Sequence, residues 1–202
     1  MLALAVTLAL ASTMLARIAR ANPDALSARV EELLSAGVEA SGAHAAILAL
    51  GEAGAQALIA VFERSEAARF VRLRALSELQ RFESETSARY FEGLVRKAAV
   101  DDGRLGELHP ARSPLVLRRA LEGLVPTARS LSPPPPLALL TPCLEHPDAH
   151  VRRLASTLLA TLDDRAVEPA LTKQLSHERS RMVRASLERG LTSRSALRAA
   201  PR

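Results

Sequence analysis

The chain of 202 residues is 48% apolar and 24% charged, with a formal net charge of +5, a composition that excludes a disordered chain and suits one folded core. Only 2% of the residues are aromatic and Trp is absent, so helices are favoured over strands, which prefer aromatic and β-branched side chains. A single cysteine excludes an intrachain disulfide and does not indicate a redox compartment.

The N-terminal segment resembles a targeting sequence. Residues 1–16 carry no charged side chain, Arg17 and Arg20 follow them, and Ala19-Arg20-Ala21 has the small-x-small pattern of a cleavage site. We expect a signal peptide over residues 1–21 and export to the periplasm, which would lower the formal charge from +5 to +3. A membrane anchor is the first alternative, because arginines after an apolar run favour a cytoplasmic C-terminal side. A buried first helix in a cytoplasmic protein is the second.

The rest of the chain repeats one apolar pattern, in which a Val is followed by an apolar residue four positions on and a Leu eight positions on. Offsets of four and eight place three side chains on one face of an α-helix, so each copy predicts a helix with one buried face. A weaker fifth copy has Gly42, Ala46 and Leu50 at these positions. The four clear copies are Val71/Ala75/Leu79, Val116/Ala120/Leu124, Val151/Ala155/Leu159 and Val183/Leu187/Leu191.

The spacing of the copies leaves room for a second helix before each one. The intervals between the four Val residues are 45, 35 and 32 residues, the range of paired-helix repeats. Apolar stretches at 57–62, 136–144 and 166–175 predict the preceding helices, and the longest interval holds an extra helix over 85–100. The four prolines in 131–137 predict an extended connector.

These elements predict an all-α solenoid, a superhelix of stacked antiparallel helical hairpins, because one hairpin cannot bury its apolar face alone. The repeat domain is expected over residues 22–192, and residues 193–202 are expected to be a frayed or disordered tail. Ser113-Pro114 predicts a helix start, and Gly51 and Gly190 predict turns or helix ends.

The stretch HPDAHVRRLASTLLATLDDRAVEPAL, residues 146–171, resembles the HEAT repeat family, particularly the short bacterial HEAT-like repeats first associated with phycobilisome lyases. It has an aspartate before Val-Arg, an alanine four residues after the Val, several leucines, and an acidic turn before the next helix. In the second copy the arginines are displaced to Arg118 and Arg119. The resemblance implies that the second helix of each hairpin lines a concave surface.

Arginines recur beside the buried face of the predicted second helices and are the candidate partner-binding residues. Glu residues four positions after Arg74, Arg118 and Arg184 predict helical ion pairs that neutralise those three. Arg152 and Arg153 have no such glutamate and are therefore the leading candidates. Alternatively, the arginine after Val pairs with an acidic turn residue of its own or the next repeat. The candidates are Arg72, Arg74, Arg118, Arg119, Arg152, Arg153 and Arg184.

No other constellation predicts chemistry. Cys143, His146 and His150 have the spacing of half a zinc site, but Pro147 separates the two histidines and no second ligand pair follows. The sequence contains no nucleophile elbow, phosphate-binding loop or glycine-rich dinucleotide motif. We therefore expect no catalytic residue, metal, cofactor or enzymatic activity.

The expected function is that of a non-enzymatic scaffold or adaptor that binds a protein partner on the concave face. One alternative is binding of a nucleic-acid backbone by the arginine-bearing face, which the scarcity of aromatic side chains for base stacking and the export signal disfavour. An accessory lyase-like role, suggested by the resemblance, would need a chromophore or cofactor pocket. Membrane contact is expected only through the N-terminal segment.

Overall fold

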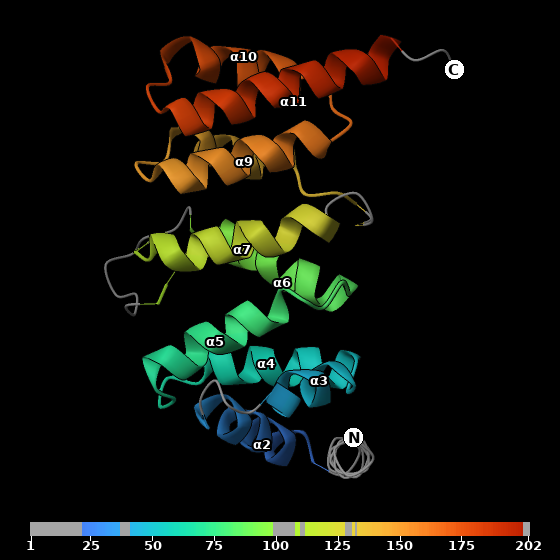
Figure 1. Cartoon of the computed structure of the whole chain (residues 1–202), viewed down its shortest axis with the longest axis vertical. Coiled ribbons are helices and arrows are strands. Elements are labelled where there is room, and N and C mark those ends of the chain that lie inside the picture. Colours follow the sequence, from blue (N-terminus) through green and yellow to red (C-terminus); the bar gives the residue numbers. More distant parts are fainter. Residues whose placement is uncertain are drawn as a thin grey trace. The chain divides into compact units, whose positions relative to one another are not determined.

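A computed structural model describes residues 22–36, 41–98, 108–109, 112–127, 131 and 133–199. Every regular element in these ranges is a helix, so the all-α prediction is confirmed (Figure 1). The predicted signal peptide, with its anchor and first-helix alternatives, lies outside the described residues. The chain divides into two compact units, Met1–Tyr90 and Phe91–Arg202, which we describe separately.

The first unit is organised around one helical hairpin. Asn22 caps the first helix by accepting hydrogen bonds from the backbone N–H groups of Asp24 and Ala25. Gly51 has φ +54° at the turn before α4, a left-handed conformation that glycine adopts without steric cost. The helix α4 packs against α5 to form the hairpin, and α2 packs against both. The helices are α2 (Pro23–Ser35), α3 (Ser41–Leu48), α4 (Glu52–Glu63), α5 (Arg69–Leu79) and the first part of α6 (Glu85–Lys97).

The second unit contains two helical pairs and a further helix. The helices α7, α9 and α11 lie one beside the next, because α9 contacts both of the others (Figure 1). The short helix η1 packs against α9, and α10 packs against α11. The elements after α6 are α7 (Pro114–Thr127), α8 (Leu137–Leu140), the 3-10 helix η1 (Thr141–Glu145), α9 (Ala149–Thr161), α10 (Val167–His177) and α11 (Arg181–Ala199).

The repeated apolar face is buried in all four clear copies. Each lies on its own helix, α5, α7, α9 or α11, and every one of its twelve positions is buried except Leu191, which is half-buried. The weaker fifth copy is less regular, because α3 ends before Leu50 and both Gly42 and Leu50 are half-buried. The offset pattern therefore identified the core of the second helices.

The structure differs from the sequence expectations at two boundaries. The predicted helix over 136–144 is a four-residue α-helix that continues as η1, because Pro142 has no N–H to donate to the α-helical ladder. Gly190 does not end a helix. It lies inside α11, where a Cβ atom would stand 3.0 Å from the Cβ of Ala160, so glycine permits close packing against α9.

The expected tail from residue 193 is helical as far as Ala199. Arg194 explains the longer helix: it is buried, and its guanidinium donates to the carbonyls of Leu162 and Asp164 just after α9. Residues 200–202 lie outside the described residues. Among the helices that the structure describes, none alone has the length and apolar character to cross a membrane, while one pair bent by 114°, Gly42–Leu48 with Glu52–Glu63, meets both criteria together.

The packing of α6 on α7 depends on a glycine. A Cβ atom at Gly123 would overlap the ring of Phe91, with its Cζ atom 2.7 Å away, whereas a Cβ atom at Gly93 would meet nothing within 4 Å. We predict that Gly123→Ala lowers the free energy of unfolding by about 1–3 kcal/mol through overpacking. Gly93→Ala, the matched control, should raise it by up to about 1 kcal/mol, because alanine favours the helix. Urea denaturation measures both, and equal effects would contradict the packing.

Candidate partner-binding site

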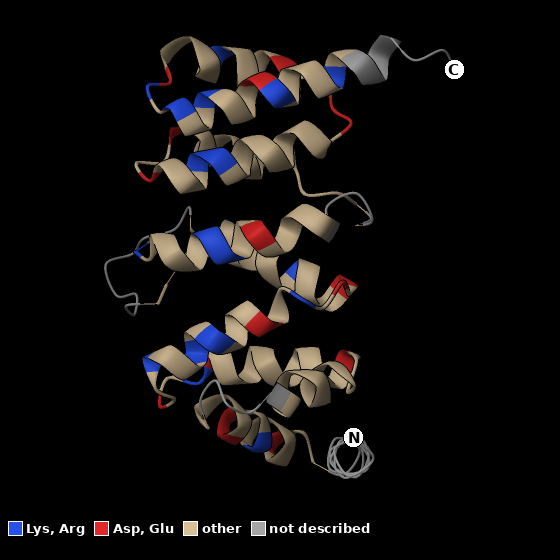
Figure 2. Ribbon diagram, viewed as in Figure 1, with Lys and Arg blue, Asp and Glu red and all other residues tan. Residues whose placement is uncertain are grey.

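The seven candidate arginines lie on α5, α7, α9 and α11, as the sequence predicted. Figure 2 shows basic residues on these four helices, with acidic residues among them on α5, α7 and α11 but not on α9. The structure divides the seven by what their guanidinium groups contact. Some are used to hold the hairpins together, and the others remain on the surface.

The arginine that follows Val binds the end of the preceding helix in the first and last clear copies. Arg72 donates from Nε to the carbonyl of Phe62 at 2.7 Å, and its guanidinium lies 5.5 Å from the centre of the Phe62 ring. Arg184 donates from Nη1 to the carbonyls of Leu175 and Glu178 at 3.2 and 3.3 Å. The last carbonyls of a helix lack intrahelical donors and favour a cation, so these arginines act as C-terminal caps.

Arg74 has the same kind of role two residues further along α5. Its Nη1 donates to the carbonyl of Leu34 near the end of α2, at 2.8 Å. The predicted partner Glu78 instead contacts His44 at 2.5 Å and Arg81 at 3.5 Å. Of the three predicted helical ion pairs, Arg184–Glu188 is present at 3.9 Å. Arg74 thus connects α5 to α2.

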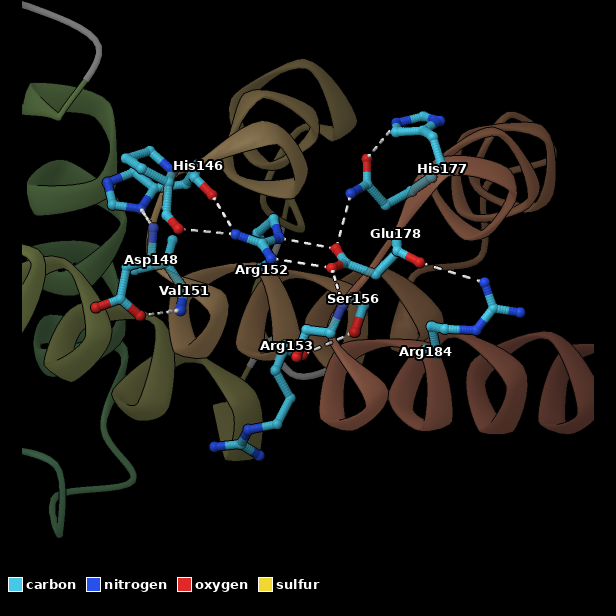
Figure 3. Close-up of polar contacts among 12 residues, drawn as sticks. His146, Asp148, Val151, Arg152, Arg153, Ser156, His177, Glu178 and Arg184 are labelled. Carbon is cyan, nitrogen blue, oxygen red and sulfur yellow. Dashed lines mark hydrogen bonds and ion pairs between the residues drawn. The ribbon is translucent and has the colours of Figure 1, made fainter.

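Arg152 lies at the centre of a polar network (Figure 3). Its Nη1 donates to the carbonyls of His146 and Pro147 at 2.8 and 2.9 Å, the turn that follows η1. Its Nε and Nη2 donate to the two carboxylate oxygens of Glu178 at 2.8 and 2.9 Å. Both side chains are largely buried, with 17% of Arg152 and 2% of Glu178 exposed. The pair therefore joins α9 to the turn between α10 and α11.

Glu178 is held as a carboxylate by four donated hydrogen bonds. Besides the two from Arg152, it accepts one from Gln174 Nε2 at 3.1 Å and one from the backbone N–H of Ser180 at 2.8 Å. Chiefly because of the hydrogen bonds from Arg152, and despite the opposing effect of burial, the pKa of Glu178 falls from 4.5 to about 2. A bidentate pair of this kind is specific in geometry as well as charge.

Arg152 has no glutamate four positions on, as the sequence showed, but it has an acidic partner in Glu178. Four of its five N–H donors bind Glu178 and two carbonyls, so little of its guanidinium remains to contact another molecule. The alternative, in which the arginine after Val pairs with an acidic turn residue of the next repeat, describes this contact. A signal for Glu178 was present in the sequence, because an acidic residue stands five positions before Val in two copies, as Glu66 and Glu178.

Arg153, the other leading candidate, differs from its neighbour. It is half-buried, points away from the Arg152 network in Figure 3, and makes no hydrogen bond or ion pair within the part of the chain that the structure describes. Its backbone carbonyl accepts hydrogen bonds from Ser156 and Thr157 at 2.8 and 3.1 Å. The side chain at position 153 therefore has no structural function that these contacts reveal.

The two candidate arginines of α7, Arg118 and Arg119, both interact with acidic groups. Arg119 forms an ion pair of 3.0 Å with Glu122, which the sequence had assigned to Arg118. The Nε of Arg118 is buried and has no hydrogen-bond partner among the described residues. Burial raises the pKa of Asp148, but its hydrogen bonds from two backbone N–H groups of α9 and the nearby charge of Arg118 lower it further than burial raises it. Arg118 thus interacts electrostatically with the start of α9.

A polar cleft of about 440 Å³ lies beside the Arg152–Glu178 pair. Most of its charges are already paired, since Glu145 is 3.6 Å from Lys173. His146 accepts a hydrogen bond from the Asp148 N–H at its Nδ1, and burial is the main cause of its lowered pKa, so the ring is neutral near pH 7. The lining residues are Glu145, His146, Pro147, Arg152, Gln174, His177, Glu178 and Arg179.

The possible zinc ligands are not arranged as a site. Cys143 is buried in η1, and burial raises its pKa to about 11, which disfavours the thiolate that binds a metal. His146 uses its Nδ1 in the turn. The residues that the structure describes contain no group of three His, Cys, Asp or Glu side chains that could hold a metal ion.

No protein-family model matches this chain, and the search of curated proteins finds no match for it. The HEAT-like interpretation therefore rests on the internal repeat and on the helical pairs described above.

The two adjacent arginines of α9 give a direct test of the site analysis. We predict that Arg152→Ala lowers the free energy of unfolding by about 3–5 kcal/mol, because it leaves the buried carboxylate of Glu178 without its counter-ion. Arg153→Ala should change it by less than about 0.5 kcal/mol, as expected for a surface position without contacts. Urea denaturation of the two variants measures the difference, and similar losses would contradict the assigned roles.

The Arg152–Glu178 pair also predicts a pH dependence. Because the pKa of Glu178 is lower in the folded chain than its ordinary value, the pair stabilises the fold fully above about pH 4.5 and ceases to do so as the pH falls toward 2. The lowering of the Glu178 pKa from 4.5 to about 2 corresponds to roughly 3 kcal/mol of folding free energy. Between about pH 6 and pH 2, wild-type stability should therefore fall by roughly 3 kcal/mol more than that of Glu178→Gln. Glu188→Gln, at an exposed position of α11, serves as the control and should lose as much stability over this pH range as the wild type.

Proposed function

We propose that this chain is a non-enzymatic protein-binding scaffold or adaptor, built of HEAT-like helical hairpins stacked as an α-solenoid. Two observations support the architecture. The same apolar face is buried on four helices. In three copies the arginine after Val binds carbonyls at the end of the preceding helix, so the repeat reproduces a contact as well as a pattern.

The proposed binding surface is the solvent-facing side of α7, α9 and α11, which would be the concave side of such a stack. The observation that carries the proposal is the contrast on α9, where Arg152 uses four N–H groups in internal contacts, whereas the half-buried Arg153 has no hydrogen-bond or ion-pair partner among the described residues. An arginine fork without an internal partner offers five N–H donors in a fixed geometry that suits carboxylates. Export of the chain, if its N-terminal segment is a signal peptide, would place the partner in the cell envelope.

Charge reversal at position 153 tests this function. We predict that Arg153→Glu removes the partner proteins that co-purify with tagged wild-type chain, because a repulsive charge then faces the partner. Arg165→Glu is the matched control: Arg165 is exposed in the turn between α9 and α10, forms no ion pair within the part of the chain that the structure describes, and undergoes the same change of charge. Quantitative mass spectrometry of crosslinked, affinity-purified samples measures the loss.

Three outcomes would contradict this proposal: retention of every partner by Arg153→Glu, equal losses in both variants, or material that disappears on nuclease treatment. The last would favour the nucleic-acid alternative. Circular dichroism of both variants excludes unfolding as the cause of a loss.

A further inference from the structure

Hydroxyl contacts fix how α9 and α11 lie beside each other. The Ser186 hydroxyl is 2.8 Å from that of Ser156 and 3.1 Å from that of Thr157, and it donates to the carbonyl of Arg153 at 3.4 Å. Further along, a Cβ atom at Gly190 would stand 3.0 Å from the Cβ of Ala160. Both contacts pair residues about 30 positions apart, so the two helices run in the same direction with Ser156 level with Ser186.

This register places a defined set of exposed and half-buried side chains along the seam. On α9, His150, Arg153 and Thr157 are three and four residues apart and share one stripe. On α11, Met182 and Arg189 lie four residues before and three residues after Ser186, and so share the side that borders α9. We name these five residues the α9–α11 strip. Its order along the seam is His150, then Met182 with Arg153, then Thr157 followed by Arg189.

The strip combines positive charge with one exposed apolar side chain. Neither Arg153 nor Arg189 has a hydrogen-bond or ion-pair partner in the described part of the chain. Met182, 38% exposed, is one of two large hydrophobic side chains exposed in that part. The strip itself contains no carboxylate, and the nearest one in sequence, Glu188, lies 3.9 Å from Arg184. A ligand that complements the strip therefore carries acidic groups for the two arginines and one apolar group for Met182.

We propose that the α9–α11 strip binds an extended acidic segment of a partner protein, in which one apolar residue and two carboxylates occupy alternate positions. The apolar residue contacts Met182, and the carboxylates pair with Arg153 and Arg189. Alternate residues of an extended chain lie on one side at intervals of about 6.6 Å. Along the strip, Met182 and Arg153 are nearly level on the two helices, and Arg189 lies six residues, about 9 Å, further along. Long arginine side chains accommodate the difference.

This inference rests on the proposed protein-binding function and names the class of partner. A nucleic-acid strand would also supply negative charge for Arg153 and Arg189, but it would give Met182 no apolar partner. The two classes therefore differ in how they respond to a change at Met182. The apolar contact is the feature that favours an acidic peptide.

The test measures binding of the full chain to a fluorescein-labelled peptide with Leu, Glu and Glu at alternate positions separated by Ser. We expect Arg153→Glu and Arg189→Glu each to raise the Kd at least about fivefold, and Met182→Ser to raise it about threefold. Arg165→Glu, the charge-matched control, should leave the Kd unchanged. Raising the salt from about 50 to about 200 mM should weaken binding severalfold, because the contacts are exposed. Fluorescence anisotropy measures each Kd, and circular dichroism confirms that each variant is folded.

Several results would overturn the inference. These are no binding of the peptide, equal binding of a peptide with the same residues in scrambled order, an unchanged Kd in Arg189→Glu, or tighter binding of single-stranded DNA that is insensitive to Met182→Ser. Sedimentation showing that the strip is covered by a second copy of the chain would do the same. If the peptide fails while Arg153→Glu still loses its co-purifying partners, the scaffold function stands and only the acidic class is wrong.

Discussion

An amphipathic helix that buries a face of small aliphatic side chains must have a close neighbour on that face, and this requirement organises both units. The chain has almost no large aromatic residues to fill wide gaps, so helices must approach closely, as they do where Gly123 faces Phe91 and Gly190 faces Ala160. A hairpin of two such helices leaves part of its apolar face uncovered. Packing of α9 against both α7 and α11 supplies the missing cover.

Arginine provides the second recurring contact. The end of a helix presents carbonyls without donors, and a long side chain from the next helix can reach them without disturbing the apolar face. Arg72, Arg152 and Arg184 do so from the position after Val. Arg152 adds the buried pair with Glu178, which links successive helical pairs. The arginine-rich composition is thus partly structural, since four of the seven candidate arginines bind backbone carbonyls within the fold.

The proposed binding surface follows from which arginines the fold uses in internal contacts and which it does not. A surface becomes available for binding where the fold does not already use its charges. On α9 the fold uses Arg152 and leaves Arg153, and on the neighbouring helix it leaves Arg189, about two turns after the exposed Met182. The polar cleft beside Glu178, by contrast, is lined by groups that mostly contact one another. The α9–α11 strip is therefore a better candidate for recognition than the deeper cleft.

The sequence alone determined the helical class, the positions of the four second helices and the apolar face that each of them buries, because the spacing of apolar side chains reports directly on which face of a helix lies in the core. It placed the candidate arginines on the correct helices but could not distinguish Arg152 from Arg153. The tertiary structure decided that, since the partner of Arg152 lies 26 residues away on another turn. It also decided that Gly190 and residues 193–199 continue α11, because the close approach of Ala160 and the carbonyls bound by Arg194 belong to α9 and to the turn that follows it. Local spacing records a helix face, whereas a contact between distant segments exists only once the helices have packed.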